Sequence, residues 1–244
     1  MKTFNYNKTS GNLLNYDNNS KTKKGQKKGY KTAILYLASH KQSGFNVCPM
    51  ASVGCAKSCL YSAGMGKFSN VQLGRINKTR WFMQDRKTFL NKLIQEIKKF
   101  EIRCKKEKFK PCIRLNGTSD ISWENFKLFE LFPKIKFYDY TKIYKRALNY
   151  VNGRYASNYH ITYSLNEDNR KEAFSILKMG GNISAVFRDT LPTSYDGFKV
   201  INGDETDLRF LDPKNCIVGL KAKGEAKKDY SGFVLESYPE ALVA

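Results

Sequence analysis

The segment Thr32-Ala-Ile-Leu-Tyr-Leu-Ala38 is apolar over almost its whole length. It is far shorter than the roughly 20 apolar residues of a membrane span, and it suits a strand buried on both faces, as in parallel sheets. Beyond it, apolar strand-like runs alternate with helix-like segments. This alternation predicts right-handed β/α units that build a parallel sheet.

Later strands are expected at residues 112–116, 135–139, 159–164, 182–187, 198–201 and 216–220, and helices at 70–81, 86–104, 122–132, 142–151 and 168–179. No glycine-rich dinucleotide or P-loop motif follows a strand. Polar residues recur instead at the C-terminal ends of the strands, where β/α barrels bind their ligands. We therefore expect an α/β fold, with a partial or full parallel β/α barrel of the TIM type.

The first 30 residues differ in composition from the rest, because Asn, Lys, Ser and Gly dominate them. We expect a basic, flexible or loosely docked arm, which only Phe4, Leu13, Leu14 and Tyr16 could anchor. Residues 31–244 are expected to form a single barrel domain, with an irregular loop at residues 40–66 after the first strand. The N-terminus lacks the apolar stretch of a signal peptide, so export is not expected.

That loop carries three cysteines, Cys48, Cys55 and Cys59, with the spacing C-x6-C-x3-C. Thiolates bind soft metals, and three from one short loop can hold an iron–sulfur cluster or a tetrahedral ion. His40 could add the fourth ligand of a zinc site. If no residue does so, one iron of a 4Fe–4S cluster stays open to a further ligand.

The remaining cysteines, Cys104, Cys112 and Cys216, fall near a helix end or at strand starts. In a barrel these positions lie toward the end opposite the cysteine loop. We expect them to be buried thiols in the core, since free cysteines often behave as small hydrophobic residues.

A cysteine triplet on the loop after the first strand of a β/α barrel resembles the radical SAM architecture. That resemblance implies a 4Fe–4S cluster on Cys48, Cys55 and Cys59. The usual spacing of that superfamily is C-x3-C-x2-C, and the segment Asn116-Gly117-Thr118-Ser119-Asp120 stands where its glycine-rich motif would be. We therefore expect weak or absent cleavage of S-adenosylmethionine (SAM).

Longer stretches of the chain resemble the bacteriophage protein family gene product 88. The matching segments are Cys48–Cys59, Arg114–Asp120, Phe137–Lys142, Gly203–Arg209 and Val218–Gly224. The resemblance implies a viral origin, a shared fold and a place in the host cytoplasm. It does not imply a reaction.

Seven residues near the strand ends are expected to contact a small polar or anionic ligand beside the cluster: Asn116, Asp120, Asp139, Lys142, Ser164, Asn166 and Lys223. Two of them have plain structural alternatives, because Asp120 could cap a helix together with Ser122, and Lys142 could be a solvated lysine. Asp204, Asp207 and Arg209 are expected to form an exposed salt bridge.

Lys and Arg total 43 and Asp and Glu 22, which gives a formal net charge of +21 with both histidines neutral. Such a charge favours anionic partners, so nucleic acid is a possible partner, although no recognition motif is visible. No membrane association is expected. The leading hypothesis is an iron–sulfur protein in electron transfer or cluster-dependent chemistry. The alternative is a zinc-stabilised nucleic-acid-binding protein.

Overall fold

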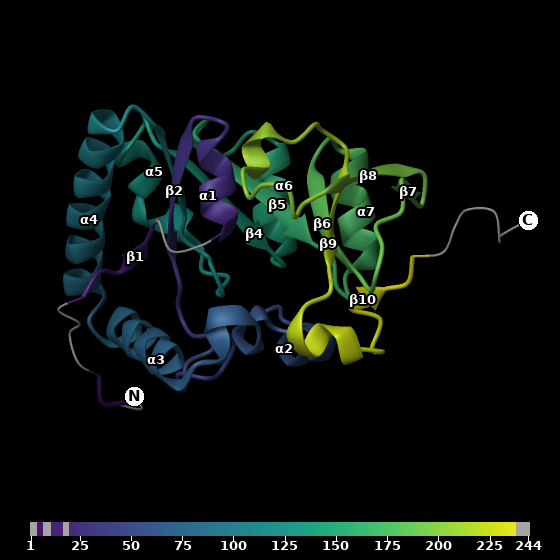
Figure 1. The fold of residues 1–244 in the computed structure, drawn as a ribbon, viewed down its shortest axis with the longest axis horizontal. Coiled ribbons are helices and arrows are strands. Elements are labelled where there is room, and N and C mark those ends of the chain that lie inside the picture. The colour runs from purple at the N-terminus through teal and green to yellow at the C-terminus, as the bar shows by residue number, and fades with distance from the viewer. Residues whose placement is uncertain (1–3, 7–10, 17–19, 238–244) are drawn as a thin grey trace, which may run out of the picture.

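The computed structural model describes residues 4–6, 11–16 and 20–237, and it contains one mostly parallel sheet (Figure 1). The strands are β1 (Leu14–Asn15), β2 (Tyr30–Leu35), β3 (Lys110–Arg114), β4 (Lys136–Thr141), β5 (Tyr159–Ser164), β6 (Asn182–Phe187), β7 (Ser194–Tyr195), β8 (Phe198–Asn202), β9 (Ile217–Lys221) and β10 (Val234–Leu235). The helices are α1 (Ser20–Gln26), α2 (Val53–Lys57), α3 (Ser69–Gln84), α4 (Arg86–Lys106), α5 (Leu128–Leu131), α6 (Tyr144–Val151) and α7 (Arg170–Lys178). Short 3₁₀ turns are η1 (Leu60–Ser62), η2 (Gly64–Lys67), η3 (Trp123–Phe126), η4 (Arg209–Leu211) and η5 (Gly224–Lys228).

The strand order is β1-β2-β3-β4-β5-β6-β9-β8-β7, with β10 beside β6. Strands β2 to β6 are parallel neighbours in chain order, as consecutive β/α units require. The two ends of the path, β1 and β7, pair antiparallel with one neighbour each. The predicted α/β fold with a parallel sheet is confirmed, and within the described residues the paired strands do not close on themselves.

Helices cover one face of the sheet and share its main core. Helix α4 illustrates the cause, because Phe89, Leu93, Ile97 and Phe100 recur at helical spacing and are all buried. Each such side chain stabilises the fold by about 1.5–3 kcal/mol through removal of apolar surface from water. The helices predicted at 86–104, 142–151 and 168–179 are thus confirmed as α4, α6 and α7.

The opposite face of the sheet is covered by the segment around η4. Leu208 forms a small core with Cys112 and Tyr138 and packs against Gly25 of α1. Asp207 and Arg209 are 3% and 1% exposed. The expected exposed salt bridge is therefore wrong for these two residues, because the chain folds back over the sheet and buries them.

Two further expectations need correction. The helix predicted at 122–132 is split into η3 and α5, because Lys127 takes a left-handed conformation (φ 54°) and Ser122 makes no capping hydrogen bond. The strand predicted to end at Asp139 continues to Thr141, so Asp139 lies inside β4.

The N-terminal arm is partly built into the fold. Leu13 and Leu14 are buried, Tyr16 packs against Phe100, and Phe4 packs against Phe45, so the predicted anchors are confirmed. Helix α1 contacts β2 and was not expected. Residues 1–3, 7–10 and 17–19 of the predicted arm lie outside the described residues. No helix in the described chain is long and apolar enough to cross a membrane.

Candidate functional site

The cysteine loop lies at the carboxyl end of the sheet, where α2 and the yellow C-terminal segment lie together at the bottom of Figure 1. Ser52 caps α2, since its hydroxyl oxygen accepts the Cys55 N–H at 3.2 Å. Glu167 accepts the Gly54 N–H at 2.6 Å and the Ser52 hydroxyl at 2.7 Å. This carboxylate, which follows β5 in the chain, fixes the start of α2 and therefore the position of Cys55.

Cys48 is held by weaker contacts. Its sulfur accepts the backbone N–H of His40 at 3.4 Å and donates to the carbonyl of Thr118 at 3.7 Å. His40 has a left-handed backbone (φ 47°), which turns the chain toward the loop. The His40 backbone thus contacts the first cysteine.

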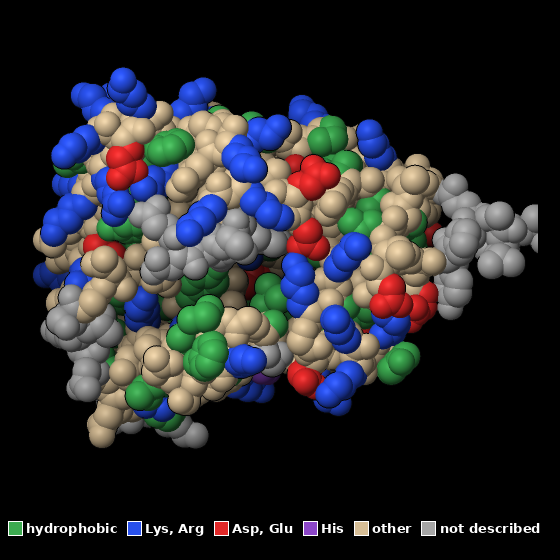
Figure 2. All heavy atoms as spheres, viewed as in Figure 1, with side chains coloured by type: hydrophobic (Ala, Val, Ile, Leu, Met, Phe, Trp, Pro, Cys, Tyr) green, Lys and Arg blue, Asp and Glu red, His purple; other side chains and the backbone are tan. Residues whose placement is uncertain are grey.

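All three cysteines line one cavity of about 220 Å³. Its other walls come from the ends of β3, β4, β5, β6 and β9 and from η5, and Figure 2 shows the hollow between the lower segments and the sheet. The cavity therefore brings the sequence-predicted cysteines beside five of the seven predicted ligand residues: Asn116, Asp120, Lys142, Ser164 and Lys223.

Burial has the largest influence on the pKa values of the Cys48 and Cys55 thiols. It raises the pKa of Cys48 to about 12, although the hydrogen bond from His40 opposes the shift. It also raises the pKa of Cys55, against the lowering effect of Lys142. Both thiols are therefore protonated at neutral pH in the free chain, and binding of a metal centre would displace their protons.

Lys142 reaches into this cavity from the end of β4. Its ammonium group donates to the Ser164 hydroxyl at 2.9 Å and lies near the Cys55 thiol. Burial alone would lower the pKa of Lys142, but the nearby Cys55 and Asp120 outweigh it and raise this pKa. Lys142 is thus a retained cation beside the cysteines, and not the solvated lysine of the alternative interpretation.

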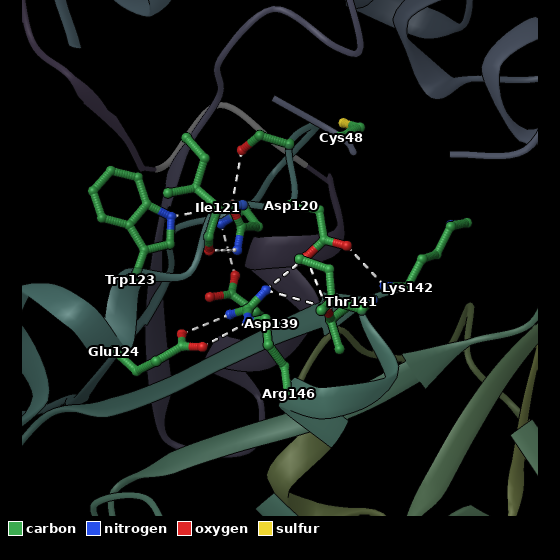
Figure 3. Close-up of polar contacts among 12 residues, drawn as sticks. Cys48, Asp120, Ile121, Trp123, Glu124, Asp139, Thr141, Lys142 and Arg146 are labelled. Atoms are coloured by element: carbon green, nitrogen blue, oxygen red, sulfur yellow. Dashed lines mark hydrogen bonds and ion pairs between the residues drawn. The ribbon is translucent and has the colours of Figure 1, made fainter. Parts of the chain in front are cut away.

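Asn116 and Asp120 direct their polar atoms at partners within the protein, and Figure 3 shows Asp120 beside Thr141, Lys142 and Arg146. The Asn116 side-chain oxygen accepts from Ser119, Ile121 and Trp123 at 2.9–3.0 Å. Asp120 accepts from Thr141, from the Lys142 N–H and from Arg146 at 2.6–2.8 Å. Arg146 also binds Glu124 and the Tyr159 hydroxyl. These residues, with Asp139, form what we call the Arg146 network: Asn116, Asp120, Glu124, Asp139, Arg146 and Tyr159.

Asp139 is buried away from the cavity. It accepts the Asn116 N–H at 2.7 Å and the Tyr159 hydroxyl at 3.2 Å. Desolvation raises its pKa to about 7, although Arg146 opposes the shift. A structural role follows for Asp139, which joins β3, β4 and β5.

Asn166 lies outside the cavity, and Lys223 lies at its mouth. Asn166 donates to the Met50 carbonyl at 3.5 Å and accepts the Asp168 N–H, so it supports the cysteine loop from outside the cavity. Lys223 lines the mouth and forms an ion pair with Asp204 at 2.5 Å. Ligand contact by these two residues stays a prediction.

Sequence reasoning missed several cavity residues, namely Arg114, Tyr140, Ser184, Asp207 and Phe233. Arg114 pairs with Asp207 at 3.3 Å, although 93 residues separate them. Strand alternation could have identified Tyr140, because it shares the face of Lys142. Nothing local marks Phe233, and the sequence predicts Asp207 only as part of an exposed salt bridge.

The three cysteines can be compared with the ligands of a zinc ion and with those of a cubane iron–sulfur cluster. A tetrahedral zinc ion needs thiolates about 3.8 Å apart, since a Zn–S bond is about 2.3 Å. Among the described residues, no three His, Cys, Asp or Glu side chains are grouped to hold a metal ion. A cubane cluster binds each thiolate through a separate iron, so it asks for sulfurs that are spread around a cavity wall. All three cysteines line one cavity, which is the condition that the second arrangement sets.

Comparison with known proteins identifies a family. A model of the family described as Gene product 88 matches residues 12–236. No curated protein and no solved structure matches the chain. The match covers the cavity, the cysteine loop and the Arg146 network.

Proposed function

The chain belongs to the gene product 88 family, and we propose that it is an iron–sulfur protein whose 4Fe–4S cluster is held by Cys48, Cys55 and Cys59. The observation that carries the proposal is that three cysteines from one loop line a single cavity at the carboxyl ends of parallel strands. The chain order of β2 to β6 supports a radical-SAM-like partial barrel. The host cytoplasm, where thiols stay reduced, suits such a centre.

The protein would contribute position, charge and exclusion of water. Glu167 holds the start of α2, and the Thr118 carbonyl holds Cys48. Phe233 and Leu220 form an apolar wall that limits access of water. When bound, the cluster supplies one-electron chemistry or an open iron for a ligand.

The cavity also supports a small polar or anionic ligand. Lys142 and Ser164 lie beside the cysteines, and Lys223 lies at the mouth. The volume of about 220 Å³ is below the roughly 300–1,000 Å³ typical of pockets for drug-sized molecules. A ligand the size of SAM has little room there beside a cluster. We therefore expect reduced, cluster-replete protein to yield no 5′-deoxyadenosine from SAM above a cluster-free control, and multiple turnovers would contradict this.

One observation favours the second candidate, a zinc-stabilised protein that binds nucleic acid. The Nδ1 atom of His40 is buried and has no hydrogen-bond partner among the described residues, as a free metal ligand would be. The net charge of +21 would supply phosphate contacts. Binding of duplex DNA that weakens steeply with salt, together with stoichiometric zinc, would favour this candidate over the cluster.

The cysteines test the proposal directly. Replacing Cys48, Cys55 and Cys59 together with Ala should abolish iron binding in anaerobically purified protein. Cys104→Ala and Cys112→Ala are matched controls, because both thiols are 0% exposed and lie outside the cavity. These controls should keep their iron. Equal iron in the triple variant and the wild type would contradict the proposal.

A further inference from the structure

The backbone of Lys142 is fixed at the end of β4. It directly follows β4, and its backbone N–H donates to Asp120 Oδ2 at 2.8 Å. Thr141 donates to the other oxygen of the same carboxylate. Because Asp120 is itself paired with Arg146, the end of β4 is fixed to the Arg146 network (Figure 3). The Lys142 side chain therefore extends into the cavity from a rigid support.

Most other charges in the cavity wall are neutralised by partners. Arg114 pairs with Asp207, Asp120 with Arg146, and Lys223 with Asp204. The Lys142 ammonium instead hydrogen-bonds the Ser164 hydroxyl at 2.9 Å, and it lies near the Cys55 thiol and the Asp120 carboxylate. It also lies 5.9 Å from the centre of the Phe233 ring. Its positive charge is thus directed at the cysteine side of the cavity.

From this placement, and resting on the proposed function, we infer that the Lys142 ammonium raises the reduction potential of the cluster held by Cys48, Cys55 and Cys59. Reduction adds one electron to the cluster, so the reduced state carries one more negative charge near this cation. A fixed charge stabilises that state more strongly in a partly buried site than in water. Charge and hydrogen bonds at cysteine sulfur are recognised determinants of cluster potentials.

The test is a redox titration of the purified holoprotein, with dithionite as electron donor and the reduced cluster followed by electron paramagnetic resonance. Lys142→Met removes the charge and should make reduction about tenfold less favourable, which is 59 mV for a one-electron couple. Lys142→Arg keeps the charge and should stay within about threefold of the wild type. Lys57→Met is the matched control: Lys57 lies between Cys55 and Cys59 in sequence but is exposed, so its loss should also change little.

Lys142→Gln provides a second neutral variant that keeps a hydrogen-bond donor, in case the Met variant loses iron. Cluster-replete Met or Gln variants with the wild-type potential would overturn the inference and leave the proposed function intact. Rescue by Gln as complete as by Arg would also overturn it, since hydrogen bonding rather than charge would then set the potential. A wild-type protein without any cluster would instead contradict the proposed function itself.

Discussion

Arg146 makes hydrogen bonds of 2.6–3.0 Å to Asp120, Glu124 and Tyr159, whereas Cys48, at the same end of the sheet, has sulfur contacts of 3.4 and 3.7 Å. The Arg146 network is buried and uses its donors and acceptors within the protein. The cysteine loop turns its sulfurs toward a cavity. Because sulfur is a larger atom, its longer contacts are ordinary, and the difference that matters is burial: the network is internal structure, and the loop is where we propose the chemistry.

The largest expected loss of stability comes from replacing Arg146 in this network. Arg146→Met leaves the Asp120 and Glu124 carboxylates buried without their cation, which should lower the free energy of unfolding by about 3–5 kcal/mol. Urea denaturation followed by circular dichroism measures this. Arg170→Met removes an exposed ion pair with Asp196 and should cost less than about 1 kcal/mol. Equal effects of the two substitutions would contradict the structural role of the network.

The second prediction tests whether Glu167 positions the cysteine loop. Glu167→Ala removes the carboxylate that fixes the start of α2, and it should speed iron release to a chelator about tenfold, as loss of groups that orient metal ligands commonly does. Its neighbour Asp168 is exposed, so Asp168→Ala serves as the control. If both variants release iron at the wild-type rate, Glu167 does not position the cysteine loop.

A more gradual effect concerns pH, because it is spread over about three pH units. Burial raises the pKa of Asp139 to about 7, above the unfolded value of about 3.9, so the folded state binds a proton that the unfolded state has lost. The protonated Asp139 side chain stabilises the folded state below about pH 4. This stabilisation is lost as the pH rises toward 7, by at most about 1.4 kcal/mol per pH unit. Asp139→Asn should remove this contribution. Parallel stability curves of the two proteins between pH 4 and 7 would show that Asp139 does not titrate this way.

Local patterns predict much of the fold. The apolar run that begins at Thr32 and the spacing of Phe89, Leu93 and Ile97 require only neighbouring residues to be interpreted. The cysteine loop is equally local, because its three cysteines fall within 12 residues. For this reason the sequence predicts both the parallel sheet and the residues of the candidate metal centre.

The local sequence does not show which polar residues at the strand ends contact a ligand and which have structural partners. Asp139 looks like a ligand residue in sequence, but its side chain accepts from the Asn116 N–H and the Tyr159 hydroxyl, which lie 23 and 20 residues away. A polar side chain satisfied by such distant partners has the same local pattern as one open to a ligand. Arg114 and Asp207 could not be joined for the same reason. Three-dimensional neighbours decide these roles.

The most direct measurement is the metal content and visible spectrum of the full chain purified without oxygen. The account predicts a brown protein with iron and acid-labile sulfide in equal amounts, about four of each per chain, and a broad visible absorbance that dithionite bleaches. A colourless protein that carries one zinc per chain would contradict it.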